Sequence, residues 1–455
     1  MAKPSIPQGT RDFSAETIYK RNFILNSIRR VFELYGFQPL ETPAMENLDT
    51  LMGKYGEEGD KLIFKILNNG ISDPKNMDKA KAGFEKVLEG KNSSDLTERA
   101  LKYDLTIPFA RYVAMNQGSL TFPYKRYQMQ PVWRADRPQK GRYREFTQCD
   151  ADVVGSTYLI NEIELCNIYH SAFLNMGLTN YILKINSRKL LTALAEICGG
   201  SNNMMPITIA IDKLDKIGLD KVKDELAARG INPSQISTIE QYLNISGNNE
   251  EKMASIRALF GNNETARQGL EEISFVVERT RELNISIDLT LARGLNYYTG
   301  IIFEAKAPAT VKMGSIGGGG RYDDLTGLFG VPGIPGVGIS FGVDRIYDVL
   351  EELELFPENI VHTAKALFFN LGAAESAVAF ELAQSLRKNG IACELYHEAV
   401  KMEKQFKYAD KKNIPFAVII GSKEMESKEA VVKNLLTEEQ QILPFVSLNQ
   451  FFAIN

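Results

Sequence analysis

Hydrophobic residues recur at helical spacing near the start of the chain. In residues 15–35 the apolar positions repeat every three or four residues, which is typical of an amphipathic helix with one buried face. Gly36 follows as a helix stop, and the next segment, FQPLETPAM, is predicted to be extended because it carries two prolines. The apolar stripe consists of Ile18, Phe23, Ile24, Ile28, Val31, Phe32 and Tyr35.

A period of two, typical of a strand, begins at residue 285. Ile285, Ile287, Leu289 and Leu291 alternate with smaller or polar residues and share one face. Arg293 continues that apolar face. A guanidinium group in such a position either pairs with a carboxylate in the core or points at an anion.

Residues 121–155 predict two strands joined by a basic loop. At period two, one face carries Arg126, Gln128, Gln130, Val132 and Arg134 on the first strand and Arg144, Phe146, Gln148, Asp150 and Asp152 on the second. A solvated face of an antiparallel sheet is one interpretation. The loop also concentrates Arg137, Lys140 and Arg142 beside Arg134, and the strands carry Gln, Arg and Asp rather than Lys, Glu and Thr. We therefore favour a site for a phosphate-bearing ligand, because arginine offers a planar fork to phosphate oxygens.

Glycine-rich segments mark a second candidate site. In GVGISFGVDRIYDVLEEL (336–353), a strand should lead into a helix that begins near Val343. Arg345 then lies in the first helical turn, where a cation is unfavourable unless an anion binds there; a surface arginine is the alternative. The run of four glycines at 317–320 does not fit a nucleotide-binding motif, so it more simply allows close backbone packing or ligand approach. The YDLT segment at 103–106 supplies a carboxylate and a hydroxyl that could hold an ammonium group.

The rest of the chain suggests further divisions. Residues 73–98 are polar and rich in Lys and Glu, which predicts a surface insertion, and residues 190–280 are helical in pattern and could form a small module. After residue 362, short apolar strands alternate with helical stretches, which predicts a separate α/β domain.

Composition narrows the chemistry. The chain of 455 residues is 44% hydrophobic and 24% charged, as in ordinary globular proteins, and it has no apolar run of about 18 residues that would predict a membrane span. Its start has no secretory or transit pattern, so we expect a cytoplasmic protein. The four cysteines and three histidines are scattered, which predicts reduced thiols and no zinc. The net charge of −4 argues against bulk attraction to nucleic acid but leaves room for a local basic surface.

Together, these segments resemble the histidyl-tRNA synthetases, a family of class II aminoacyl-tRNA synthetases. The similar segments are, in chain order, PQGTRDF, PLETP (motif 1), YDLTIPFARYVAMN, VWRADRPQKGRYREFTQCDADVVG (motif 2), LARGLNYYTG, GGGGRYDDL and GVGISFGVDRIYDVL (motif 3). The resemblance implies an α+β fold with a catalytic domain built on an antiparallel β-sheet flanked by helices. The catalytic domain would comprise residues 1–189 and 281–355, with a helical insertion at 190–280 and a C-terminal α/β anticodon-binding domain at 362–455.

The resemblance also implies a reaction and its partners. A histidine–tRNA ligase joins L-histidine to ATP as histidyl-adenylate, releases pyrophosphate, and transfers histidine to tRNA-His. Mg²⁺ would accompany ATP, with no protein side chain predicted as its ligand, and motif 1 would form a homodimer interface. The C-terminal domain would bind the anticodon end of the tRNA, and the helical insertion would embrace its acceptor arm. No membrane association is implied.

Site residues follow from motif position in the family. The catalytic pair would be Arg134 and Arg293, which approach the α-phosphate of ATP from two sides, while Arg345 would hold the γ-phosphate end. The histidine ring would be bound by Asp152 and Tyr298, and the α-ammonium group by Asp104, Thr106 and Gln148; Leu105, Tyr297, Arg134 and Arg293 complete the predicted histidine site.

Two residues depart from the family pattern. Asn296 stands where Asp is usual in the RGLDYY signature, and Asp152 stands where Glu is frequent. The main alternative is the synthetase-like regulatory subunit of ATP-phosphoribosyltransferase, a non-catalytic protein of the same fold. The presence of Arg134, Arg293, Arg345 and the C-terminal region argues against that subunit, and the adenylation arginines also argue against a generic RNA-binding α/β protein.

Overall fold

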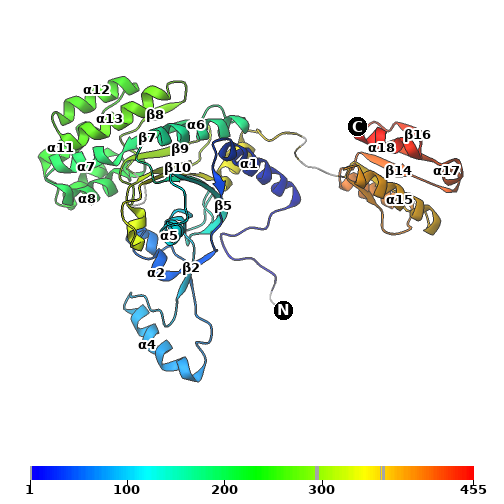
Figure 1. Ribbon diagram of the computed structural model, residues 1–455, viewed down its shortest axis with the longest axis horizontal. Helices are drawn as coiled ribbons and strands as arrows, with labels where there is room; N and C mark the ends of the chain where they lie inside the picture. Colours follow the sequence, from blue (N-terminus) through cyan, green and yellow to red (C-terminus); the bar gives the residue numbers. More distant parts are fainter. Residues whose placement is uncertain (1–2, 293–296, 359, 361–363, 455) are drawn as a thin grey trace. The chain divides into compact units, whose positions relative to one another are not determined.

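The computed structural model describes residues 3–292, 297–358, 360 and 364–454 (Figure 1). The chain divides into two compact units, Met1–Pro357 and Glu358–Asn455. None of the described helices is both long and apolar enough to cross a membrane.

An eight-stranded sheet forms the centre of the first unit, in the order β1-β5-β6-β11-β10-β9-β7-β8. The inner pairs, from β5 through β7, are all antiparallel, and only the edge pairs β1–β5 and β7–β8 are parallel. The mostly antiparallel sheet and its helices confirm the predicted α+β fold. The strands are β1 (Gln38–Pro39), β5 (Tyr124–Trp133), β6 (Glu145–Val154), β7 (Ile182–Ser187), β8 (Ile285–Ile287), β9 (Ile301–Lys306), β10 (Ser315–Tyr322) and β11 (Gly336–Gly342).

Helices cover the apolar face of this sheet. The helix α1 (Ala15–Leu34) confirms the predicted 15–35 helix: the Ser14 hydroxyl accepts from the Thr17 N–H at its start, and Gly36 takes a positive φ of 76° beyond its end. Ile24 and Phe32 are fully buried, but Ile18 of the predicted stripe is 41% exposed. α1 packs on α6 (Ile160–Asn175) and α14 (Val343–Glu352), which in turn contact β11 and β6.

The strand predicted through Leu291 is shorter than its pattern. β8 ends at Ile287 because the Asp288 side chain accepts from both the backbone N–H and the hydroxyl of Thr290, and this local turn competes with the strand ladder. Leu289 and Leu291 are still buried, so the apolar pattern correctly predicted which side chains are buried, although not where the strand ends.

The helices of residues 190–280 share one core with the sheet. Ile207 and Tyr242 belong to the same hydrophobic cluster as Ile185 and Phe303 on the strands. This helical region therefore shares its apolar core with the first unit. Its helices are α7 (Arg188–Ile197), α8 (Met204–Ile211), α9 (Leu214–Ile217), α10 (Leu219–Ala228), α11 (Pro233–Leu243), α12 (Asn249–Phe260) and α13 (Glu264–Arg279).

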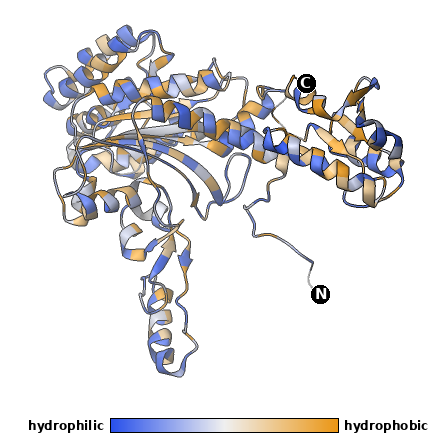
Figure 2. Ribbon diagram, turned by 45° about the vertical axis from the view of Figure 1, so that its right-hand side comes forward, coloured by the Kyte–Doolittle hydropathy of each residue, from blue (hydrophilic) through white to orange (hydrophobic). Residues whose placement is uncertain are grey.

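A small sheet of order β2-β4-β3 lies beside the central sheet. The segment 73–98 includes α4 (Met77–Leu88), which extends from this small sheet as an arm (Figures 1 and 2). Phe84 and Leu88 on that helix are 57% and 73% exposed. The remaining elements here are β2 (Met45–Asn47), α2 (Leu48–Leu51), α3 (Gly56–Asp60), β3 (Lys65–Ile66), β4 (Arg99–Leu101) and α5 (Thr106–Asn116).

The second unit is a five-stranded sheet of order β13-β12-β14-β15-β16 with helices on both faces. On β12, Ala366 and Phe368 face one apolar cluster, whereas Leu367 and Phe369 at and after its end face another. Its elements are β12 (Ala366–Phe368), α15 (Ala373–Lys388), β13 (Cys393–Leu395), α16 (Met402–Lys411), β14 (Phe416–Ile419), α17 (Ser422–Ser427), β15 (Glu429–Asn434), β16 (Gln440–Pro444) and α18 (Leu448–Ile454).

Candidate active site

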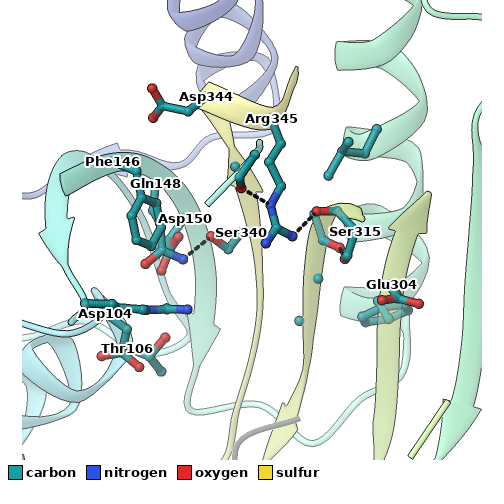
Figure 3. Close-up of a pocket in the computed structure, with 18 of the residues that line it drawn as sticks. Asp104, Thr106, Phe146, Gln148, Asp150, Glu304, Ser315, Ser340, Asp344 and Arg345 are labelled. Atoms are coloured by element: carbon teal, nitrogen blue, oxygen red, sulfur yellow. Dashed lines mark hydrogen bonds between the residues drawn. The ribbon is translucent and has the colours of Figure 1, made fainter. Parts of the chain in front are cut away.

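A cavity of about 350 Å³ lies on the polar face of the central sheet (Figure 3). Seven of the predicted site residues line it: Asp104, Thr106, Arg134, Gln148, Tyr297, Tyr298 and Arg345. Leu105 and Asp152 are not among the described lining residues, and Arg293 and Asn296 lie outside the residues that the structure describes.

Strand register brings the polar side chains together. Across β5 and β6, Arg126 pairs with Asp152, Gln128 with Asp150 and Gln130 with Gln148, so all six side chains share a face. The odd-numbered residues Cys149, Ala151 and Val153 of β6 point into the apolar core instead.

Burial decides between the two interpretations of this polar face. Arg126 and Gln128 are completely buried, and Asp150 and Asp152 are 3% and 2% exposed. The interpretation as a solvated sheet face is therefore wrong. Buried polar groups need partners, so this face is built to bind polar groups.

Glycines allow other groups to pack closely against the strands at the cavity. A Cβ at Gly338 would meet Oδ1 of Asp152 at 2.0 Å, and one at Gly320 would meet the Tyr298 ring at 2.8 Å. A Cβ at Gly319 would meet the Gly338 carbonyl oxygen at 2.1 Å. The glycine run thus allows close packing of backbone and side chains, as its sequence suggested.

Two arginines are fixed at this cavity by backbone carbonyls. The Nε of Arg134 donates to the Tyr103 carbonyl at 3.0 Å, and its guanidinium lies 4.3 Å from the Tyr103 ring centre and 5.1 Å from that of Phe146. Arg345 donates to the carbonyls of Gly141 and Ser315 at 2.7 and 2.6 Å (Figure 3).

Nearby acids balance the positive charge of these arginines only in part. Burial and the neighbouring cations Arg142 and Arg134 lower the pKa of Arg345. Within the described residues, neither Arg134 nor Arg345 forms an ion pair with a carboxylate. Such a pair of cations is suited to an anionic ligand.

Asp104 lies near Arg134, beside the start of α5. Its carboxylate accepts from the Tyr55 hydroxyl at 2.9 Å, the Ile107 N–H at 3.2 Å and the Tyr297 hydroxyl at 3.3 Å. Burial raises the pKa of Asp104, while these donors and Arg134 lower it. Thr106 lines the cavity next to it (Figure 3).

Asp152 is held by partners behind the cavity wall. It forms a buried ion pair with Arg126 at 2.9 Å and accepts from the Tyr322 hydroxyl at 2.7 Å. Burial raises the pKa of Asp152, and Arg126 lowers it. Leu105 is fully buried, and its carbonyl accepts from Arg126 at 3.3 Å. The roles predicted for Asp152 and Leu105 stay predictions.

Several lining residues were not predicted from sequence. Asp150 and Phe146 share the strand face of Gln148, so the pattern contained the signal for both. Ser340 lies within the GVGISFG strand, and Glu304 lies in the largely apolar strand β9, where it pairs with Lys306. A charge inside a mostly apolar strand was the available signal for Glu304.

Comparisons with known proteins match both units. Residues 87–346 match the family model described as histidyl-tRNA synthetase, and residues 365–453 match an anticodon binding domain. The chain is 51% identical to a histidine–tRNA ligase of Flavobacterium johnsoniae, with 99% of each chain covered. It is 52% identical to a histidine–tRNA ligase of Bacteroides fragilis, with 97% of each covered.

The chain belongs to the histidyl-tRNA synthetase family. It is therefore an aminoacyl-tRNA synthetase with the function of a histidine–tRNA ligase. The crystal structure of histidyl-tRNA synthetase from Nostoc sp. PCC 7120 agrees, with a TM-score of 0.81 and 31% identity over the whole of both chains. Histidyl-tRNA synthetase relatives at this identity also decide against the regulatory-subunit alternative.

Proposed function

We propose that the described cavity binds L-histidine and ATP side by side and forms histidyl-adenylate. One observation carries this proposal: a single cavity is lined by carboxyl and amide groups, among them Asp104 and Gln148, and by Arg134 and Arg345, which pair with no carboxylate among the described residues. The carboxyl and amide groups suit the amino group and ring of histidine, and the arginines suit the phosphates of ATP.

The chemistry requires positive charge where the two substrates meet. The carboxylate of histidine attacks the α-phosphate, the bond to the β-phosphate breaks, and pyrophosphate leaves. Because two anions must approach each other, fixed cations at the α-phosphate stabilise the transition state. We assign this role to Arg134 and, by family position, to Arg293, and we assign the γ-phosphate end to Arg345.

Amino-acid recognition falls to the polar groups around Asp104 and Gln148. Asp104, Thr106 and Gln148 would hold the α-ammonium group, and Tyr297 would form a wall. Asp152 and Tyr298 would recognise the ring, with Leu105 supporting the site from beneath. A competing amino acid would leave these polar groups unpaired, which penalises it without an editing site.

Mg²⁺ fits this site as a companion of ATP rather than as a resident ion. The described residues contain no group of three His, Cys, Asp or Glu side chains that could hold a metal. Asp136 and Glu304 line the cavity as single carboxylates that pair with Arg142 and Lys306, so the ion would be held chiefly by the phosphates. When bound, it would shield the charge of the phosphates.

The tRNA would span both units. The match of residues 365–453 to an anticodon binding domain supports an anticodon role for the predicted 362–455 domain. The insertion at 190–280 would contact the acceptor arm, and residues 1–189 and 281–355 would supply the catalytic domain. The 3′-terminal ribose hydroxyl then attacks the histidyl carbonyl, and AMP leaves.

We also propose a homodimer that forms through motif 1, residues 39–43. Leu34 and Met45, which flank this segment, are 75% and 49% exposed, and exposed apolar side chains of this kind support an interface. Light scattering should give twice the monomer mass. The expected location is the cytoplasm.

Kinetics of the arginine variants test the assigned roles. Arg293→Ala and Arg134→Ala should slow single-turnover adenylate formation by about 100-fold or more. The histidine dissociation constant, measured by calorimetry, should change far less. Comparable losses in rate and in binding would contradict the transition-state role.

A further inference from the structure

Asp150 has an unpartnered carboxylate oxygen at the cavity. The residue is 3% exposed and lines the cavity, yet its Oδ1 has no hydrogen-bond partner. A buried acceptor without a donor is costly unless a ligand supplies one.

The neighbouring carboxylates already have donors. Asp104 accepts three hydrogen bonds, and Asp152 has its ion pair with Arg126 and its bond from Tyr322. Of these three acids, Asp150 is the one left with an unpaired oxygen.

A second unpaired acceptor lies beside it. Gln148 is two residues away on the same face of β6, and its Oε1 is also buried without a partner. The amide nitrogen of Gln148 donates to the Ser340 hydroxyl at 2.8 Å, which fixes the amide oxygen on its other side (Figure 3). The Ser340 hydroxyl in turn forms a hydrogen bond with Asp150. Two such acceptors suit one donor group with several protons, such as an ammonium.

Both acids and cations surround Asp150. Burial raises the pKa of Asp150 to about 7, with Asp152 and Asp104 adding to the rise and Arg126 opposing it. Burial lowers the pKa of the nearby Lys102 to about 8, and Asp150 opposes that shift. The cations Arg126, Lys102 and Arg134 lie among these three acids, so it is the unpaired oxygens, and not an excess of negative charge, that call for a donor here.

We propose that Asp150 is a further amino-acid-recognition residue, which binds the α-ammonium group of histidine together with the Gln148 amide oxygen. This inference rests on the proposed placement of histidine in the cavity. It adds a fourth polar side chain to the expected set of Asp104, Thr106 and Gln148. The alternative is a structural role. In that case a protonated Asp150 would donate a hydrogen bond to the unpaired Oε1 of Gln128, its neighbour across the strands.

Two histidine analogues separate these roles in the full-length protein. Histidinol keeps the amino group and lacks the carboxylate, whereas imidazolepropionate keeps the carboxylate and lacks the amino group. Inhibition constants of both are measured in histidine-dependent ATP–pyrophosphate exchange with wild type, Asp150→Asn and the exposed control Asp224→Asn. Circular dichroism verifies that each variant is folded.

Asp150→Asn should raise the inhibition constant of histidinol by about tenfold or more, because a charge-assisted hydrogen bond to the amino group is lost. The KM for histidine should rise by a similar factor. Imidazolepropionate should bind within about twofold of wild type, and Asp224→Asn should change neither constant. Equal losses for both analogues, or no loss for either, would overturn the role of Asp150. A wild-type protein that shows no histidine-dependent exchange would instead overturn the proposed function itself. If Asp150→Asn does not fold, Asp150→Glu replaces it. This variant keeps the carboxylate and should therefore still bind histidinol more tightly than imidazolepropionate. A purely structural role of Asp150 would not predict this difference between the two analogues.

Discussion

The carboxylate of Asp152 lies over the Cα of Gly338, its partner in the register of β6 and β11. A methyl group at Gly338 would lie 2.0 Å from Oδ1, so Gly338→Ala must displace this side chain. Asp152 would then lose its geometry towards Arg126 and Tyr322. We expect the KM for histidine to rise by about tenfold, with a smaller change in the KM for ATP, in pyrophosphate exchange.

Gly118→Ala serves as the control for this variant, because a Cβ there would meet no atom within 4 Å. It should leave both constants unchanged. A Gly338→Ala enzyme with normal histidine kinetics would show that the position of Asp152 does not matter for recognition.

Arg345 should act on ATP and not on histidine. Arg345→Gln removes the cation that the Gly141 and Ser315 carbonyls hold at the cavity. The KM for ATP should rise by about tenfold or more, while the KM for histidine stays within about twofold. Lys140→Gln, which removes an exposed cation paired with Glu352, should change neither constant. Equal rises in both constants for Arg345→Gln would argue for a general structural role.

The ion pair of Arg321 and Glu162 should stabilise the first unit. Both side chains are buried, and the Arg321 Nη2 donates to Oε2 of Glu162 at 2.7 Å. Glu162→Gln leaves the guanidinium buried without a counter-charge, which should lower the free energy of unfolding by about 3 kcal/mol. The fluorescence of Trp133, the single tryptophan, reports denaturant unfolding of this unit.

An exposed ion pair provides the comparison for Glu162→Gln. Lys91 and Glu89 form a pair whose side chains are 70% and 61% exposed, so Glu89→Gln should leave the unfolding midpoint unchanged. Similar effects of both substitutions would mean that burial of the Arg321–Glu162 pair contributes nothing.

Asp150 should make stability depend on pH in an unusual direction. Its pKa is about 7 in the folded protein, raised by burial from an ordinary value of 3.8. The folded state therefore binds more protons between about pH 4 and pH 7, and this contribution to stability is lost as the pH rises through that range. Relative to wild type, Asp150→Asn should gain stability from pH 5 to pH 8 by at most about 3 kcal/mol. Urea unfolding at both values measures this gain, and a pH-independent difference would contradict the raised pKa.

Periodicity in the sequence correctly predicted the elements that depend only on residues close together in the chain. The helix α1 needs only its apolar stripe, Ser14 and Gly36, and all of these are local. The polar face of the hairpin could likewise be assigned because paired strands keep a period of two. The register of the two strands, which places Arg126 opposite Asp152, was not predicted.

Long-range packing accounts for what the sequence did not predict. Nothing local indicates that the 190–280 helices share a core with the sheet, because that depends on contacts such as Tyr242 with distant strands. Glu304 and Ser340 reach the cavity only through strand pairing across β9, β10 and β11. The end of β8 depended on one side-chain turn at Asp288 that competes with the ladder.

Amino-acid-dependent ATP–pyrophosphate exchange tests the central claim most directly. Purified full-length protein, with Mg²⁺ and ATP, is assayed separately with each of the twenty amino acids. The account predicts exchange with L-histidine that exceeds exchange with any other amino acid by at least about 100-fold. No exchange with histidine, or equal exchange with other amino acids, would contradict the assignment of this cavity to histidine activation.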